Sequence, residues 1–195
     1  MPSTALLRAL SDGKDLRPLP DDATSLLLEL DAPPRLAAHL RAVHQAAWEL
    51  TDSLTRAFPK LAFDREAILF GAAIHDIGKT IHTAELTGPG SLHEQAGYQL
   101  LLDHGVQDRL ARFARTHAAW TEPTNQIEDL LVSLADKVWK AKRVEDLEQL
   151  VLDRIVATHG GALWEAFQHL DDLLDQICAR ADDRLAFQAR YPVDR

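Results

Sequence analysis

Cysteine is almost absent from this chain: the 195 residues contain one, Cys178. A single thiol can form neither a disulfide nor a thiolate metal site within one chain, so the sequence excludes both kinds of intrachain site. Long apolar runs are absent too, and none approaches the roughly 20 residues that cross a bilayer. The first thirty residues have neither the basic start nor the apolar stretch of a signal peptide. We therefore expect a soluble, cytoplasmic protein.

Basic residues are also scarce. The sequence has 21 Lys and Arg against 30 Asp and Glu, a formal net charge of −9. A broad nucleic-acid groove needs clustered Lys and Arg, and the one basic cluster is formed by Lys137, Lys140, Lys142 and Arg143. We expect no extended nucleic-acid binding. A small anionic substrate remains compatible with the acidic chain, because a bound metal ion is a stronger local charge than the distant surface.

Strand signals are missing as well, because no segment sustains polar–apolar alternation and the β-branched residues are scattered. Apolar residues instead recur at helical spacing nearly throughout. With 46% hydrophobic and 26% charged residues, the sequence predicts an all-α fold, a helical bundle in one domain. Helices are expected at about 4–10, 34–57, 65–75, 91–104, 107–117, 127–142, 144–158 and 162–188, with a short apolar segment at 25–31.

Turn and capping residues set the boundaries of these helices. Pro34 suits the first helical position, where its missing N–H costs least. Asp64 and Ser91 are suited to cap the helices that follow them, and Gly160-Gly161 divides the last two helices. We divide the chain into an N-terminal helix and linker at 1–25, a main domain at 26–143 and a helical hairpin at 144–195. The hairpin is expected to pack on the same domain, and it could instead supply the face of a homodimer.

The segment His75-Asp76-Ile77-Gly78-Lys79 is the most informative part of the sequence. It places two adjacent metal-binding side chains at the end of an apolar segment. Neighbouring residues on a helix point about 100° apart, so both can bind one ion only where the backbone comes close to it, as at a helix end. Gly78 suits such a break. Lys79 would then lie one helical turn from the metal, where it can meet an anionic substrate.

Four further residues could complete a metal site. His39 lies on the apolar stripe of its helix, Asp136 lies close to an apolar face, His93 begins a helix and His117 ends one. Taken singly, each is more simply explained as a core or solvated residue. Together with the His-Asp pair they give four imidazoles and two carboxylates from five successive helical segments, and helical bundles build metal sites in this way. Mixed N and O ligands suit one or two divalent ions of Fe, Mn, Zn, Ni or Co.

The order His…His-Asp…His…His…Asp, with Gly78-Lys79 after the pair, resembles the HD-domain metal-dependent phosphohydrolase superfamily. The resemblance covers about residues 26–143. It implies that one metal ion is held by His39, His75, Asp76 and Asp136. It also implies that His93 and His117 match the two extra histidines of dinuclear members, in which the aspartate of the pair bridges both ions.

The resemblance further implies hydrolysis of a phosphate ester or anhydride of a small, nucleotide-type substrate, with a metal-activated hydroxide as the nucleophile. The expected catalytic residues are Asp76, Lys79 and His82. Lys79 would stabilise charge on the phosphoryl oxygens, and His82, one helical turn further, is a candidate for phosphate contact or proton delivery. The expected substrate-binding residues are Lys79, Lys137, Arg143 and Trp120, the last as the wall of a nucleobase pocket.

Two other functions stay open. Some HD-fold proteins with the same six-ligand pattern hold a mixed-valent di-iron centre and act as oxygenases, and ligand identity fixes neither the iron oxidation state nor the substrate. A non-catalytic module could instead sense a nucleotide without turnover. Gly97-Tyr98-Gln99 departs from the Gly-Tyr-Pro signature of HD-type cyclic-dinucleotide phosphodiesterases, so we do not expect that activity. An O₂ requirement would favour the oxygenase, and tight nucleotide binding without turnover would favour the sensor.

Overall fold

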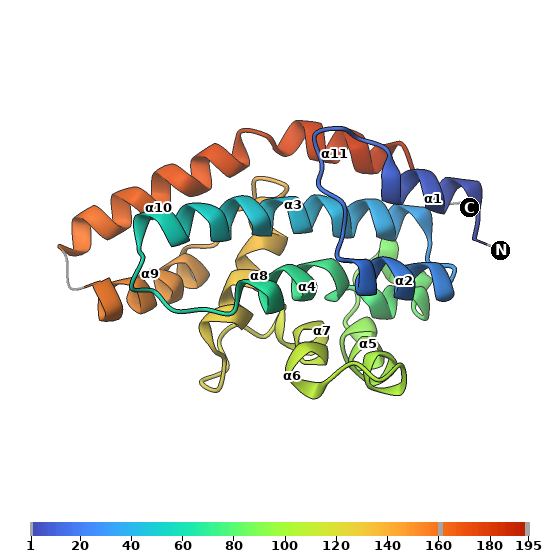
Figure 1. The fold of residues 1–195 in the computed structure, drawn as a ribbon, viewed down its shortest axis with the longest axis horizontal. Coiled ribbons are helices and arrows are strands. Elements are labelled where there is room, and N and C mark those ends of the chain that lie inside the picture. The colour runs from blue at the N-terminus through green and yellow to red at the C-terminus, as the bar shows by residue number, and fades with distance from the viewer. Residues whose placement is uncertain (1, 160–161, 194–195) are drawn as a thin grey trace.

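The computed structural model describes residues 2–159 and 162–193, and helices joined by loops make up this part of the chain (Figure 1). It contains no strand, which confirms the all-α prediction. None of its helices combines the length and apolar character needed to span a membrane. The α-helices are α1 Thr4–Ser11, α2 Asp21–Glu29, α3 Pro34–Ala57, α4 Arg65–Ile74, α5 Leu92–Asp103, α6 Asp108–Ala111, α7 Phe113–Thr116, α8 Ile127–Val138, α9 Glu145–His159, α10 Leu163–Cys178 and α11 Ala181–Ala189; two short 3₁₀ helices are η1 Ile77–Thr80 and η2 Thr83–Leu86.

The longest helix, α3, forms the centre of the bundle (Figure 1). It begins at Pro34 and ends at Ala57, as predicted. Every residue from Leu36 to Ala47 is buried, because α1, α4, α8, α10 and α11 all pack against this helix. Polar residues in that stretch therefore lie in the interior, and His39 is among them.

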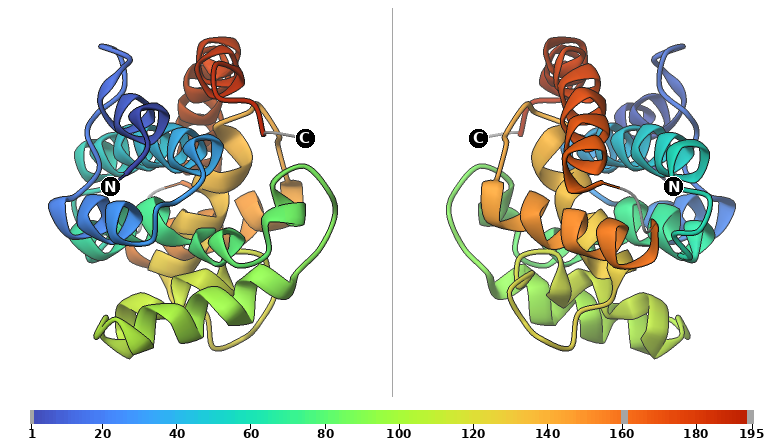
Figure 2. Two further views of the ribbon diagram at one scale, coloured as in Figure 1. Left: turned by 90° about the vertical axis from the view of Figure 1, so that its right-hand side faces the viewer. Right: turned by 90° about the vertical axis from the view of Figure 1, so that its left-hand side faces the viewer.

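Helix α4 packs against both α3 and α8 and carries the His-Asp pair into the interior. Asp64 caps it as predicted, because its Oδ1 accepts a hydrogen bond from the Ala67 amide at 3.0 Å. The helix ends at Ile74, so His75 and Asp76 follow it directly. Helices α5, α6 and α7 lie on the side of the molecule opposite α10 and α11 (Figures 1 and 2), so the pair is enclosed from both sides.

The helix expected at 162–188 is divided into α10 and α11. Arg184 explains the division, since its buried guanidinium donates hydrogen bonds to the carbonyl oxygens of Ile177 and Trp139. The Ile177 carbonyl lies in the last turn of α10, where it also accepts a hydrogen bond from the Arg180 amide at 3.2 Å. The Arg184 side chain, which follows the break, therefore supplies hydrogen-bond donors to carbonyl groups near it. No pattern in the neighbouring residues predicts where the helix is divided.

Other boundaries also differ from expectation. Helix α8 ends at Val138 rather than 142, because the chain turns at Ala141 with a left-handed φ of 57°. The helix expected at 107–117 forms two short helices, α6 and α7, which meet at Arg112. The break expected at Gly160-Gly161 lies outside the described residues.

Arg41 fixes the N-terminal segment to α3. This side chain is 2% exposed, and its guanidinium donates to the carbonyl oxygens of Ala9 at 3.0 Å, Leu16 at 2.9 Å, Arg17 at 3.4 Å and Asp12. Buried carbonyl groups need such donors. The segment that the sequence suggested was a simple polar link is therefore packed onto the bundle by a buried charge.

Acid is expected to destabilise the fold through His44, which is buried on α3. Burial, together with the charges of Arg17 and Arg41, lowers its pKa to about 4. The folded chain keeps this imidazole neutral, whereas the unfolded chain takes up a proton near pH 6.5. The free energy of unfolding should therefore fall as the pH drops from about 6.5 to about 4, by about 3 kcal/mol in total.

Urea unfolding of His44→Leu across this pH range should show a shallower decline than the wild type. His169→Gln removes an exposed imidazole and serves as the matched control. Equal declines in the wild type and in His44→Leu would contradict the assignment.

Candidate metal centre

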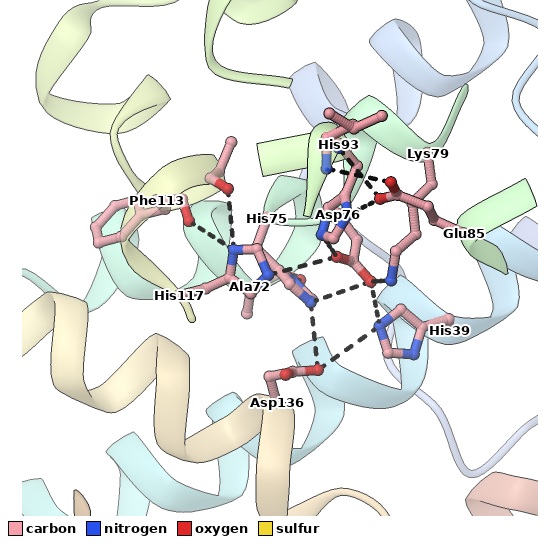
Figure 3. Close-up of polar contacts among 12 residues, drawn as sticks. His39, Ala72, His75, Asp76, Lys79, Glu85, His93, Phe113, His117 and Asp136 are labelled. Carbon is pink, nitrogen blue, oxygen red and sulfur yellow. Dashed lines mark hydrogen bonds and ion pairs between the residues drawn. The ribbon is translucent and has the colours of Figure 1, made fainter. Parts of the chain in front are cut away.

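Six buried side chains converge where α3, α4, α5, α7 and α8 meet (Figure 3). All six are between 0% and 8% exposed. They form two groups, and within each group one ligand atom per residue lies within 4.8 Å of the others. The first group is His39, His75 and Asp136, and the second is Asp76, His93 and His117. The structure thus brings together all six residues that the sequence suggested as metal ligands.

The Asp76 carboxylate lies between the two groups. Its Oδ2 is 3.1 Å from His39 Nε2 and 3.7 Å from His75 Nε2. Its Oδ1 is 3.0 Å from His93 Nε2 and 3.5 Å from His117 Nε2. One oxygen faces each group, so a carboxylate placed in this way can serve both groups of ligands.

Asp136 completes the first group from α8. Its Oδ1 is 3.4 Å from His75 Nε2 and 3.8 Å from His39 Nε2. The second oxygen accepts a hydrogen bond from Lys137 Nζ at 2.6 Å. Lys79 Nζ lies 2.5 Å from Asp76 Oδ2 in the same manner. Each buried carboxylate therefore contacts imidazoles and one ammonium group.

The histidine nitrogens fit metal ligation. Among the described side chains, the Nε2 atoms of His39, His75 and His93 are buried and make no properly directed hydrogen bond, although carboxylate oxygens are near. On the other side of the ring, Nδ1 lies 3.0 Å from a backbone carbonyl oxygen in both His75 and His117. Since a carbonyl oxygen only accepts, it fixes the proton on Nδ1 and leaves the Nε2 lone pair free for a metal ion.

The carboxyl groups are held in their ionised form. Burial alone would raise the pKa of Asp76, but the neighbouring imidazoles of His75 and His39 outweigh it and hold the pKa well below its ordinary value. Burial would likewise raise the pKa of Asp136, and the adjacent imidazole of His75, with the charge of Lys137, lowers it instead. Both groups can therefore act as anionic ligands at neutral pH.

The imidazoles differ in their surroundings. Burial lowers the pKa of His39, and it lowers the pKa of His117 to about 4. Burial also acts to lower the pKa of His93, but the carboxylates of Asp76 and Glu85 outweigh it, so that the pKa is raised. Because metal ions bind neutral imidazole, protons compete with a metal ion at His93 more than at the other two.

Comparison with protein families agrees with this geometry. The family model described as the HD domain matches residues 36–186. The chain belongs to the HD domain family. Its superfamily is one of metal-dependent hydrolases, and the buried His and Asp groups could hold the metal. The match runs beyond residue 143, where we placed the end of the main domain.

One curated relative matches most of the chain. It is a tRNA (cytidine(56)-2'-O)-methyltransferase from Picrophilus torridus, 26% identical over 190 residues, which include 88% of this chain and 51% of that protein. The chain thus spans about half the length of that relative. No solved structure matches the chain.

Gly78 of the HD motif has a role that differs from the expected one. We predicted a glycine that breaks the helix, but α4 ends at Ile74 and Gly78 has no positive φ. A β-carbon at Gly78 would collide with the His93 carbonyl and would lie 2.6 Å from the Gly97 amide nitrogen. The glycine is required because η1 and α5 approach each other at backbone distance, which places His93 beside Asp76.

Glu85 is a residue of the HD domain that the sequence did not reveal. We expected Ser91 to cap α5, but Ser91 makes no capping bond with its side chain. The carboxylate of Glu85 accepts hydrogen bonds from the Leu92 and His93 amides instead. Glu85 and His93 are eight residues apart and are separated by a loop that contains Gly and Pro. No helical spacing relates two such positions, so the sequence did not predict their contact.

The residues proposed to bind substrate lie in different surroundings. Trp120 is partly buried beside the centre, with its ring 5.4 Å from Lys137 Nζ. Arg143 instead contacts the carboxylates of Glu148, Asp171 and Asp175 at 2.6–2.9 Å. Its guanidinium thus joins the loop after α8 to the hairpin of α9 and α10, and we do not retain Arg143 as a substrate ligand.

His82 stands apart from the six ligands. It precedes η2 and is half-buried. Among the described residues its side chain makes no hydrogen bond or ion pair. The structure therefore neither joins His82 to the cluster nor gives it another partner.

Metal content provides the direct check of this centre. Protein purified without oxygen and reloaded with Mn²⁺ should hold two ions, because two ligand groups share Asp76. His75→Ala should lose at least one ion, since it removes a ligand from the first group. His104→Ala, which removes an imidazole that lies outside the six-residue cluster, is the matched control. Elemental analysis that finds one ion or none in the wild type would contradict the two-ion arrangement.

Proposed function

We propose that this protein is a metal-dependent phosphohydrolase that cleaves a phosphate ester or anhydride of a small, nucleotide-type substrate. The observation that carries the proposal is the Asp76 carboxylate, which faces one group of buried ligands with each oxygen. Membership of the HD domain family supports the same reaction class.

Two divalent transition-metal ions suit the ligand set. His39, His75, Asp136 and Asp76 would hold one, and Asp76, His93 and His117 would hold the other. Fe, Mn, Zn, Ni and Co all accept such mixed N and O ligands. When bound, ions of this kind lower the pKa of a coordinated water and neutralise charge on phosphoryl oxygens.

The two lysines are suited to bind the phosphoryl group. The side chains of Lys79 and Lys137 are 19% and 13% exposed, and each ammonium group contacts a ligand carboxylate. Two anionic carboxylates in the centre thus have two ammonium groups at their edge. An ammonium group there can donate hydrogen bonds to phosphoryl oxygens and stabilise the charge that develops on them.

Trp120 and His82 extend the proposal to the rest of the substrate. The Trp120 ring lies beside Lys137, so a base stacked on the ring would place its phosphate near the lysine. His82 lies three residues after Lys79, and its unpaired imidazole is our candidate for proton delivery to the leaving group.

A small substrate agrees better with the charge of the chain than a nucleic acid does. The matched relative is named for action on tRNA, but this chain spans about half of it and carries a net charge of −9. Extended RNA binding needs a basic surface. We therefore place the substrate among mononucleotides and similar phosphate compounds.

Phosphate release from a nucleotide panel tests the function. Metal-loaded protein should release phosphate without O₂, and Lys79→Ala should lower kcat/KM about 10²–10³-fold, as expected for the loss of one group that stabilises transition-state charge. Lys142→Ala removes an exposed lysine and should leave kcat/KM unchanged. O₂-dependent turnover would instead favour an oxygenase, and tight nucleotide binding without turnover would favour a sensor.

A further inference from the structure

Glu85 joins a surface loop to one of the metal ligands. It lies in η2, and its side chain is 8% exposed. Its Oε1 accepts a hydrogen bond from the Leu92 amide at 3.1 Å, and its Oε2 accepts one from the His93 amide at 3.2 Å. The same Oε2 lies 2.5 Å from His93 Nδ1. One carboxylate thus contacts both the start of α5 and the ligand imidazole (Figure 3).

The loop around Glu85 is shaped to admit this carboxylate. A β-carbon at Gly90 would collide with the Glu85 side chain, so only a glycine leaves room for it. The three contacts span residues 85 to 93, across the Gly88-Pro89-Gly90 turn. The conformation of the loop and the orientation of the His93 ring are therefore coupled.

His93 differs in this respect from its neighbours. Nδ1 of His75 faces the carbonyl oxygen of Ala72, and Nδ1 of His117 faces that of Ala114, so each ring is oriented by the backbone of its own helix. The orientation of His93 depends instead on a side chain from a four-residue 3₁₀ helix. The group of Asp76, His93 and His117 thus includes an imidazole that is oriented by the Glu85 carboxylate, and Glu85 contacts no residue of the other group.

A carboxylate at Nδ1 has two consequences for metal binding. It fixes the proton on Nδ1, which leaves Nε2 free at 3.0 Å from Asp76 Oδ1. It also makes the imidazole a stronger donor. Removing such an outer-shell partner typically lowers metal affinity about 10–100-fold.

We propose that Glu85 is a positioning residue for His93, and that it sets the metal affinity of the Asp76–His93–His117 group without changing that of the His39–His75–Asp136 group. The inference rests on the two-ion centre of the proposed function. Through Glu85, a residue outside the six-residue cluster would then influence whether the centre holds one ion or two.

Co²⁺ titration of the metal-free chain, followed by visible absorption and by equilibrium dialysis, tests this inference. The wild type should bind two ions. Glu85→Ala should bind the first ion with unchanged affinity and the second about 10–100-fold more weakly. Glu85→Gln should recover part of the loss, because its amide oxygen can still accept a hydrogen bond from Nδ1.

Glu128→Ala is the matched control. Glu128 Oε1 also accepts a hydrogen bond from a backbone amide, that of Asp64 at 2.9 Å, but Glu128 contacts none of the six ligands. Both ions should bind this variant as they bind the wild type. Far-UV circular dichroism confirms folding of each variant, and if Glu85→Ala does not fold, weaker second-ion binding by Glu85→Gln is the required result.

Several results would overturn the inference. The first is an unchanged affinity of Glu85→Ala for the second ion. The second is an equal loss of affinity for both ions in Glu85→Ala, with no recovery in Glu85→Gln. The third is a wild type that binds one ion. None of these measurements involves turnover. A chain that binds both ions with the expected Glu85 dependence, yet releases no phosphate from any nucleotide, would refute the proposed hydrolysis and leave the role of Glu85 intact.

Discussion

Two ionised carboxylates in the interior are the constraint on which the rest of this structure depends. A buried charge costs several kcal/mol unless it is paired and hydrogen-bonded. Asp76 and Asp136 meet this requirement with imidazoles on one side and an ammonium group on the other. Replacing a buried charged pair by well-packed apolar residues of similar volume is often neutral or stabilising. The arrangement is therefore better explained by chemistry than by folding.

The sequence predicted those parts that depend on local signals. Pro34 correctly predicted the start of α3, and Asp64 predicted the cap of α4. The motif identified all six candidate ligands that the structure brings together. Prediction failed where a distant contact decides the outcome. The division between α10 and α11 is stabilised by Arg184 and the Trp139 carbonyl, and Gly78 is required by α5 rather than by its own turn. Such contacts join segments that no periodicity relates.

Two buried arginines connect the ends of the chain to the central helix and its surroundings. Arg41, on α3, binds carbonyl groups of residues 9–17, a segment that precedes the family match. Arg184, on α11, donates to the Trp139 carbonyl at 2.9 Å, and the Trp139 ring packs 5.0 Å from that of His39. Arg184 belongs to no motif, yet it helps to position Trp139 beside His39. It does so through a backbone carbonyl group, which every residue has.

The six candidate ligands are far apart in the chain, since they run from residue 39 to residue 136. Contacts between distant residues form only after the entropy of closing the intervening loops has been overcome, which makes them late events in folding. The centre is complete only once α8 has packed against α3 and α4. Ions would then bind the finished bundle rather than nucleate it, so they would slow unfolding more than they speed folding. Metal occupancy would govern how long a folded molecule persists, and the chain alone would govern how fast it forms.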